Sequence, residues 1–320
     1  MTTTTTTPTT TPRPQRLRRS ELSTPASNTR MIEKAIASDA DLAFLDLEDA
    51  VAPNEKVAAR ANVIAAFNDH DWGKTIRAYR INGVHTQWCH DDLIDVVTAA
   101  GPNVDIIIVP KVYGPRDIWF VDDLLNQLEM KLGLEPGRIG LEVLIEEAEA
   151  LGCVEAIAAA SPRLEALILG LGDLAGSQGI RPALAAQTAD GDQSLHYPGD
   201  IWHHARTRLI MAARANGLDP IDGPFANVVD TATYRRDATW VATIGAVGKW
   251  CIHPSQIAVA NTVFAPTAQE IEQASAVMAA LREAEVAGHG AATFNGMMID
   301  AAVSRIYEPV LERARMCGLA

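Results

Sequence analysis

The chain has 320 residues, of which 48% are apolar and 21% charged, and its formal net charge is −13. This length and balance are typical of a globular protein with a sizeable core. The acidic charge argues against a general nucleic-acid binder, and no apolar run approaches the roughly 20 residues of a membrane span. The four cysteines, Cys89, Cys153, Cys251 and Cys317, show no metal-binding spacing, which favours free thiols in a reducing cytoplasm.

Short apolar runs alternate with helical patterns between residues 16 and 262. The Thr/Pro-rich segment 1–15 is expected to be disordered and lacks the apolar core of a signal peptide. The expected strands are 20–23, 42–47, 75–81, 104–109, 139–145, 164–169, 218–221 and 248–252. The expected helices are 27–38, 55–67, 91–100, 118–132, 201–216 and 230–244, with a further Ala/Glu-rich helical pattern between the fifth and sixth strands. A long loop is expected at 176–199.

Eight strand–helix steps in about 240 residues match the size of a (β/α)8, or TIM, barrel, which is an α/β fold. A doubly wound open sheet is the alternative, but no strand is followed by a GxGxxG motif. Residues 263–320 form a predicted C-terminal helical extension, with helices at 267–287 and 299–318 around a Gly-rich bend at 288–298. This extension either packs on the barrel wall or acts as a lid.

Ionisable residues gather where the predicted strands end, and in parallel α/β folds chemistry occurs at the carboxyl ends of strands. They are Glu48, Asp49, Arg80, Lys111, Glu146, Asp173, Asp222 and His253. Two carboxylates without nearby His or Cys, Glu146 and Asp173, suit Mg²⁺ or Mn²⁺. A metal-free carboxylate pair acting as acid and base is the alternative.

The other strand-end residues suggest roles around this pair. Arg80 suits bidentate capture of a substrate carboxylate, and the alternative is an internal salt bridge to Glu48 or Asp49. The same two acids could orient water molecules around a metal ion. His253 has no Ser or Cys nucleophile at another strand end, which argues against a hydrolase triad.

Several motifs in chain order resemble the malyl-CoA lyases, which belong to the citrate lyase β-subunit-like (HpcH/HpaI) aldolases. They are RSELSTPASN with MIEKA (19–35), FLDLEDAVAPNEK (44–56), YRING (79–83), VPKV (109–112), LIEEAEAL (144–151), LGLGDLA (169–175) and GKWCIHPSQ (248–256). The segments GDIWHHA (199–205) and DGPF (222–225) resemble the malyl-CoA lyase branch in particular. The resemblance covers nearly the whole chain from residue 16.

This resemblance implies a Mg²⁺-dependent TIM-barrel lyase. It would reversibly cleave a 3-hydroxyacyl-CoA, such as (S)-malyl-CoA or β-methylmalyl-CoA, into glyoxylate and acetyl-CoA or propionyl-CoA. By resemblance, Glu146 and Asp173 bind the metal, Arg80 and the amides around Gly172 hold the 2-oxoacid, and Asp300 is the acid/base. The implied CoA contacts are Ser23, Asn28, Lys34, Ile252 and His253.

The resemblance also implies a cytoplasmic homo-oligomer, a trimer or hexamer, in which each lid carries Asp300 to a neighbouring subunit. Two alternative activities remain open, an (S)-citramalyl-CoA lyase and a malyl-CoA thioesterase. A CoA-binding protein without catalysis is a third reading, but Glu146, Asp173, Arg80 and Asp300 are all present and argue against it.

Overall fold

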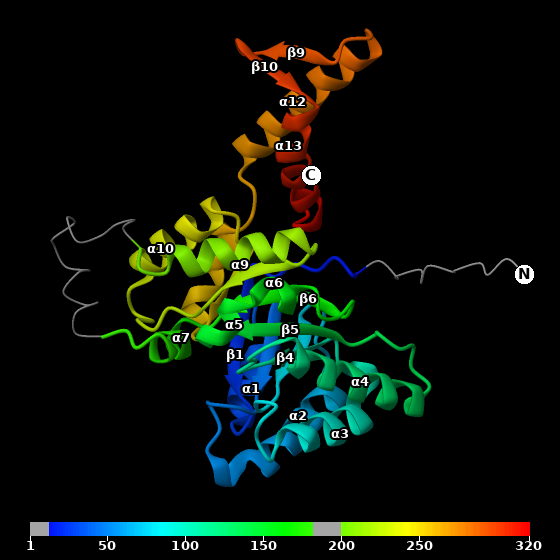
Figure 1. Cartoon of the computed structure of the whole chain (residues 1–320), viewed down its shortest axis with the longest axis vertical. Coiled ribbons are helices and arrows are strands. Elements are labelled where there is room, and N and C mark those ends of the chain that lie inside the picture. Colours follow the sequence, from blue (N-terminus) through cyan, green and yellow to red (C-terminus); the bar gives the residue numbers. More distant parts are fainter. Residues whose placement is uncertain (1–12, 182–199) are drawn as a thin grey trace, which may run out of the picture. The chain divides into compact units, whose positions relative to one another are not determined.

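A computed structural model describes residues 13–181 and 200–320 of the chain. Eight parallel strands close into a barrel in the order β1 to β8, and β8 pairs back onto β1. Figure 1 labels four of these strands, β1, β4, β5 and β6. The strands are β1 Ser20–Pro25, β2 Leu42–Asp46, β3 Ile76–Arg80, β4 Ile106–Val109, β5 Gly140–Ile145, β6 Leu164–Leu169, β7 Asp219–Asp222 and β8 Gly248–Cys251. The prediction of a TIM barrel is confirmed.

Helices follow the strands along the barrel part of the chain. They are α1 Thr29–Ile36, α2 Lys56–Asp69, α3 Cys89–Ala100, α4 Pro115–Leu132, α5 Ala148–Gly152, α6 Val154–Ala158, α7 Leu171–Ser177, α9 His203–Ala215, α10 Thr231–Thr243 and α11 Ile257–Val263, with short 3₁₀ helices at Pro53–Glu55, Gly101–Asn103 and Pro254–Gln256. The helical segment predicted between β5 and β6 is divided at Cys153 into α5 and α6. The predicted tail at 1–12 and most of the predicted loop at 176–199 lie outside the described residues.

Period-two alternation along the strands builds the barrel interior. Leu42 and Phe44 of β2, Ile76 and Ala78 of β3 and Leu144 of β5 belong to one buried cluster with residues from the other strands. Because alternate residues of a strand point to the same side, continuing this pattern predicts polar inward-facing residues at both ends of the strands. We call the carboxyl end of the barrel the mouth and the amino end the base.

β5 shows this arrangement most clearly. Glu142, Leu144 and Glu146 follow one another at every second position, and each is at most 2% exposed. Glu142 therefore lies at the base, Leu144 in the apolar middle and Glu146 at the mouth. The two carboxylates are separated by one apolar layer.

Residues 261–320 form a second compact unit. It contains α12 Ala268–Val286, an antiparallel hairpin of β9 Ala291–Phe294 and β10 Met297–Asp300, and α13 Ala301–Met316. The Gly-rich segment 288–298 was predicted as a bend, and most of it is this hairpin. Its turn contains Asn295 and Gly296, whose φ angles are 50° and 77°, as expected for a tight hairpin turn.

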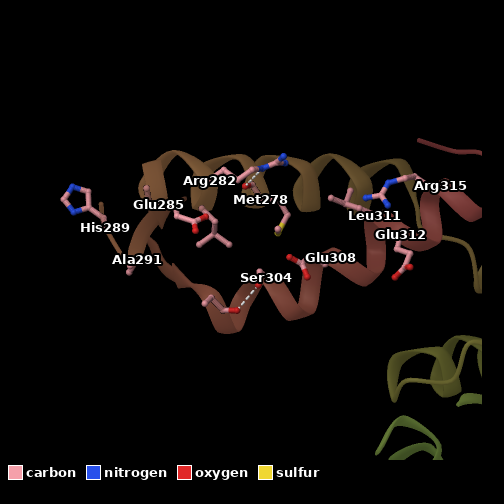
Figure 2. A pocket seen from close by; sticks show the side chains of 14 residues that line it. Met278, Arg282, Glu285, His289, Ala291, Ser304, Glu308, Leu311, Glu312 and Arg315 are labelled. Carbon is pink, nitrogen blue, oxygen red and sulfur yellow. Dashed lines mark hydrogen bonds between the residues drawn. The ribbon is translucent and has the colours of Figure 1, made fainter. Parts of the chain in front are cut away.

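A cavity of about 700 Å³ lies within this second unit, between α12 and α13 (Figure 2). Met278 and Leu311 line it from the two helices, and charged groups such as Arg282 and Glu308 surround them. Asp300, the predicted acid/base, is not among its lining residues, although the adjacent Ala301 is.

Candidate active site

Arg80, the last residue of β3, is the most firmly anchored cation at the mouth. Its Nε and Nη2 donate to the two oxygens of Asp46 over 2.7 and 2.6 Å, and its Nη1 lies 3.0 Å from Glu48 Oε2. Burial acts to lower the pKa of the Arg80 guanidinium, but the negative charge of Asp46 raises this pKa above its usual value. Since a guanidinium has five N–H groups, these two acids leave N–H groups on the terminal nitrogens for a substrate carboxylate.

Lys111 connects the mouth acids through both its backbone and its side chain. Its φ of 49° is unusual for a residue with a Cβ, and its backbone N–H donates to Glu146 Oε1 over 2.7 Å. Its ammonium group hydrogen-bonds to Glu48 and, over 2.7 Å, to Asp49. Burial acts to raise the pKa of Asp49, but the hydrogen bond from Lys111 lowers this pKa below its ordinary value.

Glu146 is the buried carboxyl group of the mouth, with 2% of its surface exposed. Burial raises its pKa to about 8, and the Lys111 N–H opposes that rise. Gly170, just after β6, makes room for it, because a Cβ there would lie 2.4 Å from Glu146 Cβ and 2.7 Å from Oε2. Glycine at position 170 is thus required by the placement of Glu146.

Asp173 supplies the second carboxylate from the first turn of α7, and its side chain is 45% exposed. Its Oδ1 lies 4.0 Å from Lys111 Nζ. Its negative charge also contributes to the raised pKa of Glu146. The structure therefore brings together Glu48, Asp49, Arg80, Lys111, Glu146 and Asp173 as one connected group.

This group fits a magnesium ion. Within residues 13–181 and 200–320, no set of three or more His, Cys, Asp and Glu side chains is arranged to hold a metal. Mg²⁺, however, commonly takes only one or two protein carboxylates and keeps several waters. A divalent cation would offset both the burial of Glu146 and its repulsion by Asp173, so the two carboxylates suit a hard cation with open positions for substrate oxygens.

Comparisons with known proteins identify the family. Residues 19–254 match the family model described as HpcH/HpaI aldolase/citrate lyase. The chain belongs to this family. It is 40% identical to an L-malyl-CoA/beta-methylmalyl-CoA lyase of Cereibacter sphaeroides, over 95% of this chain and 97% of that protein. Both the predicted family and the prediction of a lyase are confirmed.

Two further relatives extend the comparison. A (3S)-malyl-CoA thioesterase of Cereibacter sphaeroides is 35% identical over 88% of this chain and 89% of that protein. The crystal structure of the protein CitE from Mycobacterium tuberculosis in complex with magnesium, acetoacetate and coenzyme A matches with a TM-score of 0.70 and 27% identity. That match covers 92% of this chain and 97% of the other. A structural neighbour of this chain thus binds magnesium, acetoacetate and coenzyme A.

The residues that the resemblance assigns to CoA lie at the ends of β1 and β8 and on α1. Ser23 is in β1, and the exposed Lys34 is in the last turn of α1. Asn28 caps α1 by accepting from Met31 N over 3.1 Å, and the Ile252 N–H donates to Gln256 Oε1 over 2.8 Å. His253 Nδ1 lies 2.8 Å from Ser255 Oγ and caps a 3₁₀ turn.

Asp300 lies in the second unit, at the junction of β10 and α13. Its Oδ1 accepts from Ala302 N over 2.9 Å, so its carboxylate caps the helix.

Gly172 is the second residue of α7, where backbone N–H groups of a helix are free of intrahelical partners. No helix in the described part of the chain is long and apolar enough to cross a membrane.

Two findings add to the account of the strand ends. Asp222 is the last residue of β7, at a strand end as expected, and it is 3% exposed and bound by Arg206 and Lys249 in an internal ion-pair network. Asp46, which is absent from the expected site, is the main partner of Arg80. The period-two pattern of Leu42, Phe44 and Asp46 could have revealed it.

Proposed function

We propose that the chain is a Mg²⁺-dependent lyase that reversibly cleaves a malyl-CoA-type 3-hydroxyacyl-CoA into a 2-oxoacid and an acyl-CoA. The observation that carries the proposal is the pairing of a carboxylate-binding arginine, Arg80, with the buried Glu146 in one mouth. The 40% identity to a malyl-CoA/methylmalyl-CoA lyase supports glyoxylate as the oxoacid. Acetyl-CoA and propionyl-CoA are the proposed partner products.

Glu146 and Asp173 would hold the magnesium ion, which when bound supplies Lewis-acid polarisation of substrate oxygens. Arg80 binds the oxoacid carboxylate with the N–H groups that Asp46 and Glu48 leave available. The Lys111 N–H fixes Glu146, and the Lys111 ammonium group fixes Glu48. The oxoacid is thereby held in one orientation before any bond changes.

Asp300 is the proposed acid/base. In the condensation direction Asp300 takes a proton from the carbon next to the thioester, and the C–H electron pair forms an enolate whose carbon attacks the oxoacid carbonyl. The carbonyl electron pair moves to its oxygen, which takes up the proton from Asp300 and becomes the hydroxyl group. In cleavage Asp300 takes the hydroxyl proton as the carbonyl forms, the carbon–carbon electron pair forms the enolate, and Asp300 gives the proton to the enolate carbon. Exclusion of water as the lid closes would keep the enolate from being protonated by solvent.

The decisive experiment is an assay of the purified chain with malyl-, methylmalyl- and citramalyl-CoA, with Mg²⁺ or with EDTA. Oxoacid and free CoA are quantified separately. Glyoxylate with acyl-CoA supports the lyase, whereas free CoA with malate supports a thioesterase, the alternative that the relative at 35% identity favours. Pyruvate release from citramalyl-CoA supports the third activity, and unchanged turnover in EDTA would contradict the metal requirement.

Replacing Asp300 tests the proton transfer. Asp300→Ala is expected to lower carbon–carbon cleavage at least 10²-fold, the usual range for loss of an acid/base, while Mg²⁺ binding measured by calorimetry stays unchanged. Glu308→Ala, an exposed acid of the same helix, serves as the matched control. Near-normal turnover of Asp300→Ala would remove this residue from the mechanism.

We further propose a cytoplasmic homo-oligomer, a trimer or hexamer, in which Asp300 serves a neighbouring subunit. The four described cysteines are free, which suits a reducing compartment. Co-refolding Asp300→Ala with Glu146→Gln chains tests the arrangement, because hybrid oligomers would contain some sites with both wild-type residues. Recovery of activity above that of either parent is expected, and no recovery in mixed oligomers would contradict delivery between subunits.

A further inference from the structure

Trp250 of β8 lies inside the barrel and takes no part in the chemistry described so far. It is 4% exposed, and its ring centroid lies 4.6 Å from that of Phe44 at an angle of 40°. This packing alone would make Trp250 an ordinary core residue. Two further contacts of its ring involve charged groups, and these groups lie at opposite ends of the barrel.

One contact joins the indole to the base. Trp250 Nε1 donates to Glu21 Oε2 over 2.8 Å, and the two residues are register partners on β8 and β1. Glu21 is fully buried, and its other oxygen has no hydrogen-bond partner among the described residues. A buried carboxyl group with an unpaired oxygen destabilises a core. If position 21 served only to fill space in the core, an apolar side chain would be favoured there.

The other contact joins the indole to the mouth. The central carbon of the Arg80 guanidinium lies 5.5 Å from the centroid of the Trp250 ring, within the range of a cation–π interaction. Asp46 and Glu48 engage nitrogens of the same guanidinium. The ring of Trp250 thus lies beside a guanidinium whose nitrogens the two carboxylates engage.

We propose that Trp250 is a positioning residue for the oxoacid: its ring fixes the plane of the Arg80 guanidinium, and Glu21 fixes the ring. The proposal rests on the proposed function, because it assumes that Arg80 holds the oxoacid carboxylate. A carboxylate accepts two parallel N–H bonds only when it is coplanar with the guanidinium fork. Loss of the ring should therefore weaken oxoacid binding specifically and leave the thioester partner unaffected.

Trp72 offers a matched control. It is 5% exposed, its Nε1 donates to Ala66 O over 2.9 Å, and its ring lies 5.5 Å from Phe67 at 45°. Trp72→Phe therefore removes a buried indole hydrogen bond of the same kind from a site away from the barrel mouth. Any effect common to Trp72→Phe and Trp250→Phe reflects core packing.

The test measures the KM for glyoxylate and for acetyl-CoA in the condensation direction. Trp250→Leu is expected to raise the glyoxylate KM about tenfold through loss of the buried cation–π contact, with less than a twofold change for acetyl-CoA. Trp250→Phe keeps an aromatic ring but loses the hydrogen bond to Glu21, so it should raise the glyoxylate KM about threefold. Glu21→Leu should resemble Trp250→Phe, whereas Glu21→Gln keeps an acceptor and should retain most of the oxoacid affinity.

Two results would overturn the proposal: an unchanged glyoxylate KM in both Trp250 variants, or equal rises for both substrates. If Trp250→Leu fails to fold, Trp250→Phe measured against Trp72→Phe decides. In an Arg80→Lys background, Trp250→Phe should have no further effect on glyoxylate affinity, because interacting residues are non-additive. If the wild-type chain lacks lyase activity, the proposed function fails, and calorimetric binding of glyoxylate to the same variants still tests the positioning.

Discussion

The two ends of one barrel stabilise buried carboxylates in different ways. At the base, Arg18 is 1% exposed and donates to Glu142 over 2.7 Å, to Glu165, and to Asp219 over 3.0 Å. At the mouth, Glu146 accepts one backbone N–H, and the nearby Arg80 is already engaged by other acids. Glu142 lies in β5 and Glu146 directly follows that strand, four residues later, so their different surroundings reflect their neighbours and not their place in the sequence.

The difference shows where a ligand belongs. Because an uncompensated buried charge is unfavourable, the base supplies a built-in cation, and burial raises the pKa of Glu21 well above its ordinary value. The mouth lacks a side chain dedicated to Glu146, and burial raises the pKa of that carboxyl to about 8. A divalent cation would stabilise the ionised form of Glu146, which makes the mouth, and not the base, the candidate metal site.

Glu146→Gln should produce the largest effect on activity. The amide keeps the shape of the side chain but cannot supply an anionic ligand, so cleavage should fall more than 10³-fold, and calorimetry should detect no Mg²⁺ binding. Asp173→Ala should behave in the same way. Glu142→Gln, the same change at the base, should retain Mg²⁺ binding, and equal losses of Mg²⁺ binding in both glutamine variants would abolish the distinction between the two ends.

Arg18→Met should produce the largest effect on stability. Removing the cation leaves Glu142 buried without compensation and leaves Glu165 paired only with Arg16, whose Nε lies 3.1 Å from Glu165 Oε2. Breaking such a buried pair typically destabilises a protein by about 3–5 kcal/mol. Urea unfolding measures the loss. Arg208→Met is the control, because its ion pair with Glu155 is largely exposed and should contribute only about 0–1 kcal/mol.

The fold was more predictable than the contacts within it. Apolar runs such as 104–109 marked strands to within about two residues, because burial on both faces leaves a strong pattern. The partners of the charged groups were harder to predict. Nothing local indicates that Asp222 pairs with Arg206, which lies 16 residues earlier on α9. The hairpin near Asn295-Gly296 did carry a local signal, a turn dipeptide between alternating residues.

Gly170→Ala should have an intermediate effect that is confined to the mouth. The added Cβ overlaps Glu146, so the carboxylate must move, and we expect about 1–3 kcal/mol of destabilisation together with at least tenfold weaker Mg²⁺ binding. Gly176→Ala in α7 is the matched control, since a Cβ there meets nothing within 4 Å. Weakened Mg²⁺ binding in the control as well would point to α7 itself and not to Glu146.

Glu21→Gln should have the smallest effect, and one that depends on pH. In the folded state the raised pKa of Glu21 means that the proton stays bound at pH values where an unfolded glutamic acid, with a pKa near 4.5, has lost it. The folded wild type therefore loses stability as the pH rises above 4.5 toward the folded pKa. Glutamine stays neutral throughout, so urea unfolding should show a constant difference between the unfolding free energies of the two proteins well below pH 4.5. At higher pH the variant should become steadily more stable than the wild type. Parallel profiles of unfolding free energy against pH would mean that Glu21 carries no bound proton.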